Sequence, residues 1–208
     1  GRLNDINAFA ITRQHAFEAL AAARAGPVEE GSVGGGTGMI CHGFKAGIGT
    51  ASRVVESDGV PYTVGALVQA NYGTKEGLRV DGVPVGRELA RQPAERAAAA
   101  DTEYGIRTAS TSDGSIIVIL ATDAPLLPIQ CRRLARRATV GLARAGGAGY
   151  NGSGDLFLAF ATGNSIPLNS SGTLALRMLP HTQLNPFFDA AAEAVEEAIL
   201  NSLTAADT

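Results

Sequence analysis

Short apolar runs bounded by turn-forming residues alternate along the chain with longer amphipathic segments. The clearest run, residues 116–120, is continuous and rich in β-branched side chains, and Gly114 and Asp123 flank it. This pattern is typical of a strand buried on both faces and is too short for a lone helix. The same criteria predict further strands at residues 52–55, 62–69, 78–80, 156–162 and 174–179.

Apolar positions recur at helical spacing in residues 12–24, 129–145 and 187–203. Thr12 is a suitable cap for the first helix, whose expected apolar face consists of Ala16, Phe17, Leu20 and Ala21. Residues 87–101 are polar, alanine-rich and low in complexity, which predicts a flexible or partly helical surface excursion. Strands in two groups with helices beside them predict the α+β class, with stacked sheets covered by helices on both outer sides.

Composition narrows the functional classes. With 208 residues, we expect one domain. The net charge of −3 and the absence of a basic stripe argue against nucleic acid as a partner. No apolar run approaches the ~18 residues of a membrane span, and no secretory signal is present. We expect a cytoplasmic protein, with the periplasm as the alternative because the chain begins at Gly1 and not at Met.

The cysteines and histidines do not form a metal motif. Cys41 and Cys131 lie far apart without a CxxC pattern, so we interpret both as core thiols. His15, His42 and His181 are scattered and match no local zinc pattern. We therefore expect neither a metal nor a cofactor.

Two glycine-rich stretches invite comparison with phosphate-binding loops. In residues 31–50, Phe44 stands where a P-loop requires its lysine, so that motif is excluded. Two interpretations remain for this stretch: backbone N–H groups that face a bound oxyanion, or a structural cluster of tight turns. Gly147, Gly149 and Gly152 match GxGxxG, but they follow a helix and precede a strand, which is the wrong context for a dinucleotide.

The Gly114-Ser115 bond joins a hydroxyl-rich loop to the central strand. Glycine allows close approach to its carbonyl group. If the Ser115 hydroxyl attacks this group and water hydrolyses the resulting ester, the chain is cut, and Ser115 carries both its hydroxyl and a free amine. The alternative is an ordinary loop entering a strand. Ser153 and Asp155 lie two apart and share one side of an extended segment. Asn71 lies at the end of a predicted strand. Its side chain could donate hydrogen bonds to an oxyanion, or it could simply belong to a turn.

Several motifs together resemble the β-peptidyl aminopeptidase family, which includes the L-aminopeptidase/D-amidase/D-esterase enzymes. The motifs are Leu3-Asn4-Asp5, Gly31-Ser32-Val33-Gly34-Gly35-Gly36-Thr37-Gly38-Met39, Gly114-Ser115-Ile116-Ile117-Val118 and Ala121-Thr122-Asp123-Ala124-Pro125-Leu126. The resemblance implies a four-layer αββα sandwich, similar to N-terminal-nucleophile hydrolases but with different connectivity. It also implies self-cleavage into residues 1–114 and 115–208.

The resemblance assigns roles to the residues singled out above. Ser115 becomes the N-terminal nucleophile, Ser153 and Asp155 support it, and Asn71 stabilises the oxyanion. The expected substrates are small peptides or amino-acid amides, and the expected assembly is a homotetramer. Family members are longer, so the acidic group that binds the substrate amine is expected upstream of Gly1, and some C-terminal family segments are expected to be missing. The alternatives are an acyltransferase like the ornithine acetyltransferases, which use threonine, and a non-catalytic glycine-rich binding or assembly module.

Overall fold

The computed structural model describes residues 5, 7–91 and 114–207. Its centre is a four-stranded sheet whose strands follow the order β3-β4-β5-β6. These strands are β3 (Ile48–Ser57), β4 (Val60–Asn71), β5 (Ser115–Thr122) and β6 (Leu156–Ala161). The first three are antiparallel neighbours, whereas β6 runs parallel to β5. The central strand of the sequence thus lies in the interior of the sheet.

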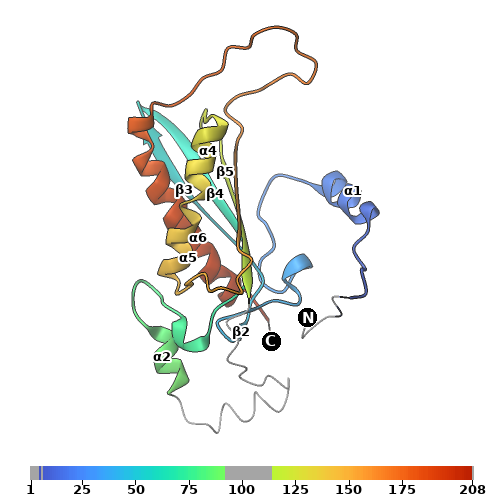
Figure 1. Ribbon diagram of the computed structural model, residues 1–208, viewed down its shortest axis with the longest axis vertical. Helices are drawn as coiled ribbons and strands as arrows, with labels where there is room; N and C mark the ends of the chain where they lie inside the picture. Colours follow the sequence, from blue (N-terminus) through green and yellow to red (C-terminus); the bar gives the residue numbers. More distant parts are fainter. Residues whose placement is uncertain (1–4, 6, 92–113, 208) are drawn as a thin grey trace.

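A layer of helices covers one face of this sheet (Figure 1). The layer consists of α4 (Pro128–Ala135), α5 (Ala138–Arg144) and α6 (Asn185–Thr204). α6 packs on β3 and β4, and α4 packs against β6. The α+β class is confirmed, and within the described ranges the chain forms one large sheet with one layer of helices.

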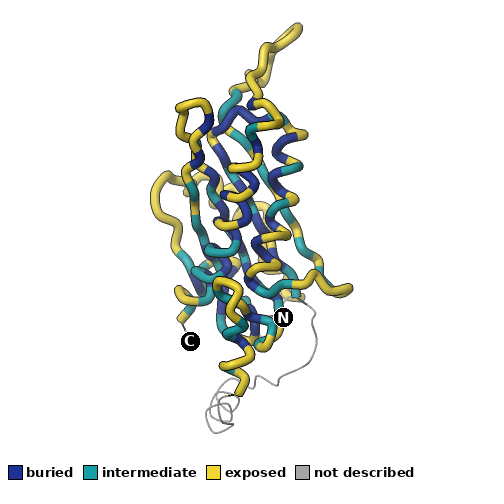
Figure 2. Tube along the Cα trace, turned by 90° about the vertical axis from the view of Figure 1, so that its left-hand side faces the viewer, coloured by how far each residue is buried: buried dark blue, intermediate teal, exposed yellow. Residues whose placement is uncertain are grey.

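The core lies between the helices and the sheet, as the buried segments in Figure 2 show. Alternate residues of β4 and β5 point toward the helix layer and are almost completely buried. Phe187 of α6 is fully buried, and its ring centroid lies 6.0 Å from that of Tyr62. Every second residue of these strands therefore packs against the apolar side of the helices.

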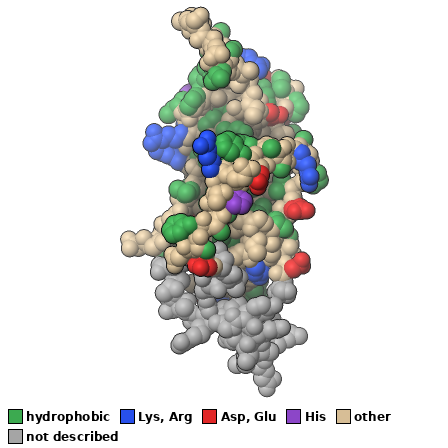
Figure 3. Space-filling view, turned by 90° about the vertical axis from the view of Figure 1, so that its right-hand side faces the viewer, with side chains coloured by type: hydrophobic (Ala, Val, Ile, Leu, Met, Phe, Trp, Pro, Cys, Tyr) green, Lys and Arg blue, Asp and Glu red, His purple; other side chains and the backbone are tan. Residues whose placement is uncertain are grey.

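Within the described residues, the opposite face of the sheet is open apart from the end of β4, where residues 34–41 lie against Gln69 and Asn71. Ile117 is 40% exposed, and Leu156, Leu158 and Phe160 of β6 are exposed beside it. The side of the molecule turned away from α4–α6 accordingly displays apolar side chains among polar ones (Figure 3). The prediction that residues 116–120 are buried on both faces is wrong for the described part of the chain, because helices cover only one of these faces.

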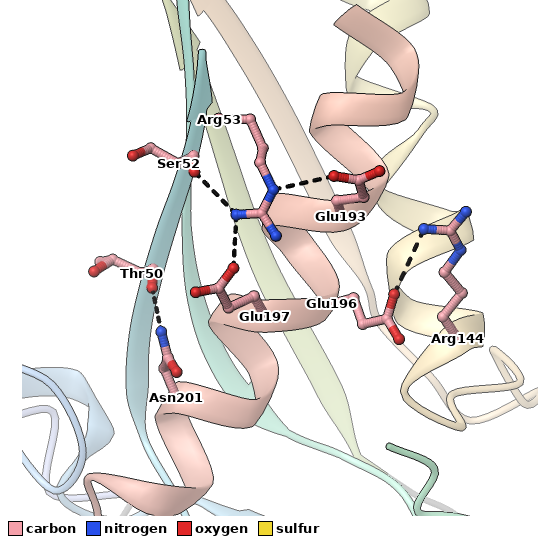
Figure 4. A network of polar contacts seen from close by, with 8 residues as sticks. All are labelled: Thr50, Ser52, Arg53, Arg144, Glu193, Glu196, Glu197 and Asn201. Atoms are coloured by element: carbon pink, nitrogen blue, oxygen red, sulfur yellow. Dashed lines mark hydrogen bonds and ion pairs between the residues drawn. The ribbon is translucent and has the colours of Figure 1, made fainter. Parts of the chain in front are cut away.

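Polar contacts fasten α6 to the sheet at its outer edge (Figure 4). Arg53 of β3 pairs with Glu193 at 3.0 Å and with Glu197 at 2.6 Å. Asn201 donates a hydrogen bond to the carbonyl oxygen of Thr50 at 2.8 Å. These partly exposed contacts set the register of α6 along β3, while most of the stabilisation comes from the apolar face beneath them.

The predicted helix at residues 129–145 is present but broken. α4 ends at Ala135 and α5 begins at Ala138, because the two helices pack on different partners. At Gly141, α5 approaches α6 so closely that a Cβ would lie 2.5 Å from the carbonyl oxygen of Ala192. The helix predicted at 187–203 is confirmed as α6.

Two predicted strands are absent from the structure. Val80 forms only an isolated bridge with Val83 across the Asp81-Gly82 turn, and Pro84 then removes a backbone donor. Residues 174–179 have no strand partner among the described residues, and Arg177 instead exchanges hydrogen bonds with Asn164. An apolar run is not sufficient for a strand when no neighbouring strand completes its hydrogen bonds.

The smaller elements lie around this frame. They are α1 (Arg13–Ala22), α2 (Val85–Ala90), β1 (Ile40–Cys41), β2 (Phe44–Lys45) and the 3₁₀ turns Gly34–Gly36, Lys75–Gly77 and His181–Gln183. α1 matches its predicted position, but it buries none of its residues and lies away from the sheet in Figure 1. α2 confirms a helical beginning of the predicted surface excursion. Residues 92–101 of that excursion lie outside the described residues.

Candidate active site

The candidate site forms where β4 ends and β5 begins. Asn71 and Ser115 are direct partners in the antiparallel β4–β5 pair. Side chains of such partners point to the same face of the sheet, with Cβ atoms about 4.5–5.5 Å apart. Both residues belong to the alternate set that faces away from the helices. The strand register therefore places the predicted oxyanion donor beside the predicted nucleophile.

The segment before β6 supplies polar partners to the Gly114-Ser115 bond. The hydroxyl oxygen of Ser115 accepts a hydrogen bond from the Gly154 N–H at 2.9 Å. Ser153 Oγ lies 3.0 Å from the carbonyl oxygen of Gly114 and 2.6 Å from Asp155 Oδ1. One hydroxyl proton serves both acceptors, so Ser153 donates to the carboxylate or to the carbonyl group, but not to both at once.

Asp155 also fixes the backbone of the central strand. Its Oδ1 accepts the N–H of Ile116 at 3.1 Å in addition to the contact with Ser153. The parallel pairing of β5 with β6 starts directly afterwards, at Ile117 and Leu156. The sheet register therefore brings Ser153 and Asp155 to Ser115, and the prediction that these two side chains share one side is confirmed.

Position 114 has room only for glycine. A Cβ there would overlap with the carbonyl oxygen of Asn71 and lie 2.9 Å from the Cα of Tyr72. Backbone atoms of β4 cannot move aside as a flexible side chain would. The close approach holds the Gly114 carbonyl group against β4, within reach of Ser153.

The side chain of Asn71 is oriented by the strand β1. Its Oδ1 accepts a hydrogen bond from the N–H of Ile40 at 3.1 Å. Because an N–H group can donate only to the amide oxygen, this oxygen points toward β1, and the NH₂ group points away from β1. An Asn71 held in this way presents donors, as an oxyanion site requires.

A small hollow borders the site on the helix-covered side. Gly114, Ser153 and Asp155 line it together with Tyr72, Tyr150 and Leu142. Ser115 and Asn71 do not line it, since their side chains face the open side of the sheet. Burial, reinforced by Cys41 and by the Asp155 carboxylate, raises the pKa of the Tyr72 phenol, so this group stays neutral.

The cysteines are unsuited to act as nucleophiles. Burial raises the pKa of the Cys41 thiol to about 12 and also raises the pKa of Cys131. Both thiols therefore remain protonated at neutral pH, and only a thiolate is strongly nucleophilic. Their interpretation as core residues is confirmed. Within the same described ranges, no three His, Cys, Asp or Glu side chains gather as a metal ion would need, and no helix is long and apolar enough to cross a membrane.

The glycine-rich stretch 31–50 favours the structural interpretation. Most of its N–H groups with assigned partners donate to the loop itself or to β3, for example Gly31 to Ile48 and Met39 to Gly36. A Cβ at Gly36 would lie 2.7 Å from the N of Ile48, so the loop packs closely on β3. The second stretch, residues 147–152, lies between α5 and β6 as expected, in a context unlike that of a dinucleotide loop.

Sequence patterns did not reveal two of the contacts that organise the site. The N–H of Gly154 binds the Ser115 hydroxyl, and the N–H of Ile40 binds the Asn71 amide. Every residue except proline has a backbone N–H group, so the residue type does not reveal such contacts. The only signal in the sequence was the high number of glycines nearby, which allow two backbone segments to approach closely. The site residues inferred from local sequence are nevertheless brought together from β4, β5 and the segment before β6.

Comparison with known proteins provides separate information on the family of the chain. The sequence pattern of peptidase family S58 matches residues 1–208. The beta-peptidyl aminopeptidase BapA of Sphingosinicella microcystinivorans is 53% identical over 213 residues, which cover 100% of this chain and 53% of the relative. The chain therefore spans about half the length of the curated relatives that it matches.

Solved structures show the same relationship. A beta-aminopeptidase from Burkholderia sp. superposes with a TM-score of 0.83 at 54% identity, covering 99% of this chain and 55% of that one. The L-aminopeptidase D-Ala-esterase/amidase of Ochrobactrum anthropi superposes with a TM-score of 0.85 at 46% identity, covering 100% and 53%. That enzyme is described as a prototype for the serine aminopeptidases and a new variant of the Ntn hydrolase fold. With a family pattern matched from end to end, the chain belongs to peptidase family S58.

Proposed function

We propose that the complete protein is a self-processing serine aminopeptidase. The observation that carries this proposal is the arrangement of Ser153 Oγ, which lies 3.0 Å from the Gly114 carbonyl oxygen and 2.6 Å from Asp155. The residue that follows this carbonyl group is Ser115, whose hydroxyl oxygen is held by the N–H of Gly154 at 2.9 Å. A nucleophile, a carbonyl group within reach of a hydroxyl donor, and a carboxylate thus meet at one peptide bond.

Self-cleavage would proceed through an ester. Ser115 Oγ attacks the Gly114 carbonyl carbon, and its proton passes to the Ser115 nitrogen as the C–N bond breaks. During the attack, the Ser153 proton turns from Asp155 to the developing oxyanion on Gly114. Water then hydrolyses the ester, which gives a carboxylate at Gly114 and frees the Ser115 hydroxyl. The single domain would become two chains, residues 1–114 and 115–208.

Turnover would use the same groups on an incoming acyl group. The free amine of Ser115 or the Ser153 hydroxyl takes the proton from Ser115 Oγ, and Asp155 orients Ser153. The amide NH₂ group of Asn71 donates to the tetrahedral oxyanion from the neighbouring strand. These roles need no histidine, metal or cofactor.

The substrates would be small peptides, amides or esters from which an N-terminal residue is released. The names of the relatives point to β-peptides and to D-alanine amides or esters as classes to test first. By the family resemblance, the complete protein would assemble as a homotetramer. A cytoplasmic location is proposed, with the periplasm as the alternative.

Intact-mass measurement of the complete protein tests the proposal. We expect two chains separated between Gly114 and Ser115, together with release of p-nitroaniline from aminoacyl p-nitroanilides. Ser115→Ala should abolish both the cut and the turnover. Ser52→Ala, on the exposed face of β3, is the matched control and should retain both. Turnover by an uncut chain would refute the mechanism, and an uncut, inactive wild type would instead favour the non-catalytic binding module.

A further inference from the structure

Lys45 occupies an unusual position at the end of β2. Its Nζ lies 3.1 Å from the carbonyl oxygen of Gly36, 3.1 Å from that of Met39 and 2.7 Å from that of Ala46. An ammonium group has three protons, so these carbonyl oxygens account for its full donor capacity. Among the described residues, no carboxylate lies within ion-pairing distance of Lys45. The protein groups that bind this charge are therefore peptide carbonyl dipoles.

Such a placement carries a cost. Burial lowers the pKa of Lys45, which means that the surroundings disfavour its charged form. The carbonyl groups that it binds belong to the glycine-rich segment and to the start of the return toward β3. The ammonium group therefore connects the segment before β1, at Gly36 and Met39, with the residue after β2, Ala46.

One peptide group links Lys45 to the candidate site. The carbonyl oxygen of Met39 accepts from Lys45 Nζ and, at 3.3 Å, from the N–H of Ala46. The N–H of Ile40, on the opposite side of the same planar peptide, donates to Asn71 Oδ1 at 3.1 Å. Lys45 and Asn71 thus bind the two ends of a single rigid unit.

The direction of this chain of hydrogen bonds suits an oxyanion donor. The positive charge on Lys45 draws electron density toward the Met39 carbonyl oxygen, which makes the Ile40 N–H a stronger donor. A stronger bond at Asn71 Oδ1 in turn strengthens the NH₂ group of Asn71 as a donor. Each group in the series, from Lys45 through the Met39–Ile40 peptide to Asn71, donates to the oxygen of the next, and Asn71 is the strand partner of Ser115.

We propose that Lys45 is a positioning residue that acts on the reaction through Asn71. It holds the Met39–Ile40 peptide in place, and this peptide fixes the orientation of the Asn71 amide beside Ser115. The inference rests on the proposed aminopeptidase function, in which Asn71 binds the oxyanion. Lys45 itself touches no substrate in this scheme, since its three protons are engaged by the backbone.

A double-mutant cycle on the complete protein tests this inference. The variants are Lys45→Met, Asn71→Ala and their combination, assayed with an aminoacyl p-nitroanilide. The value of kcat is expressed per cut chain, as counted by intact mass, so that slower processing does not mimic slower turnover. We expect Lys45→Met to lower kcat by about 10-fold to 100-fold with little change in KM, because the lost interaction acts in the transition state.

The double variant separates positioning from general weakening. If Lys45 acts through Asn71, the double variant should be no slower than Asn71→Ala alone, within about threefold. A multiplicative loss, or a kcat for Lys45→Met within about twofold of wild type, would overturn the inference. Should Lys45→Met fail to fold, Lys45→Gln, which keeps hydrogen-bond donors without the charge, enters the same cycle and is judged by the same criteria.

Lys75 provides the matched control. Its ammonium group lies 4.9 Å from the ring centroid of Phe44 in the same hairpin, without a contact to the Met39–Ile40 peptide. Lys75→Met should keep kcat within about twofold of wild type. Ser115→Ala distinguishes failure of the proposed aminopeptidase function from failure of the proposed role of Lys45. If that variant remains active, the proposed function is wrong, whereas a Ser115-dependent enzyme with additive effects of Lys45 and Asn71 overturns only the role of Lys45.

Discussion

Replacing Gly114 by alanine should disable the site without removing any functional group. The added Cβ would overlap with the carbonyl oxygen of Asn71 and would lie 2.9 Å from the Cα of Tyr72, whereas ordinary contact begins near 3.4 Å. Both obstacles are backbone atoms of the β4 end. Relief of the overlap therefore requires Gly114 to move away from β4 by about 1 Å, a displacement that typically costs on the order of 100-fold in rate.

The expected result is a loss of about 100-fold or more in the rate of self-cleavage, because the Gly114 carbonyl group leaves the reach of Ser153. Intact mass followed over time after synthesis measures this rate. Gly65→Ala is the control: it lies in the same strand β4, its φ is not positive, and a Cβ there meets nothing closer than 4.0 Å. Normal processing of Gly114→Ala would show that the close approach to β4 does not position the bond.

Two further substitutions probe the fold that carries the site. Phe187→Ala removes a fully buried ring and should lower the free energy of unfolding by about 3–5 kcal/mol in urea denaturation, whereas Phe17→Ala on exposed α1 should change it by less than about 0.5 kcal/mol. Equal effects would contradict the assignment of the core. Burial lowers the pKa of His42, so the unfolded state binds more protons and stability should fall as the pH drops below about 6.5, by at most about 1.4 kcal/mol per pH unit. His42→Asn, which tolerates the positive φ of 51°, should remove this component, and an unchanged pH profile would refute it.

Local sequence was a good guide wherever neighbouring residues decide the structure. β4, β5 and α6 were predicted within a few residues, because each carries an apolar pattern of the correct period and a partner to pack against. The β3–β4 hairpin, which we did not predict from the sequence, turns at Asp58 and Gly59, and both adopt the positive φ that a tight two-residue turn requires. Ser153 and Asp155 meet because they lie two apart on an extended segment.

Patterns failed where a distant partner decides the outcome. Residues 174–179 look like a strand but have no neighbouring strand within the described chain. The helix predicted at 129–145 breaks after Ala135 because its two halves pack on β6 and on α6. α1 has its expected bounds, yet nothing in the described structure covers its apolar side chains. The spacing of apolar residues predicts which side of a segment is suited to burial. It does not predict whether another part of the protein packs against that side.

The sequence by itself determined the chemical groups of the candidate site: a Gly114-Ser115 junction at the start of a strand, a serine and a carboxylate two apart, and an asparagine at a strand end. The tertiary structure decided which of these groups meet. The register of β4 with β5 sets Asn71 beside Ser115, and the pairing of β6 with β5 delivers Ser153 and Asp155. It also revealed Lys45, because hydrogen bonds to backbone carbonyl groups depend on how distant segments pack and leave no signature in the order of side chains.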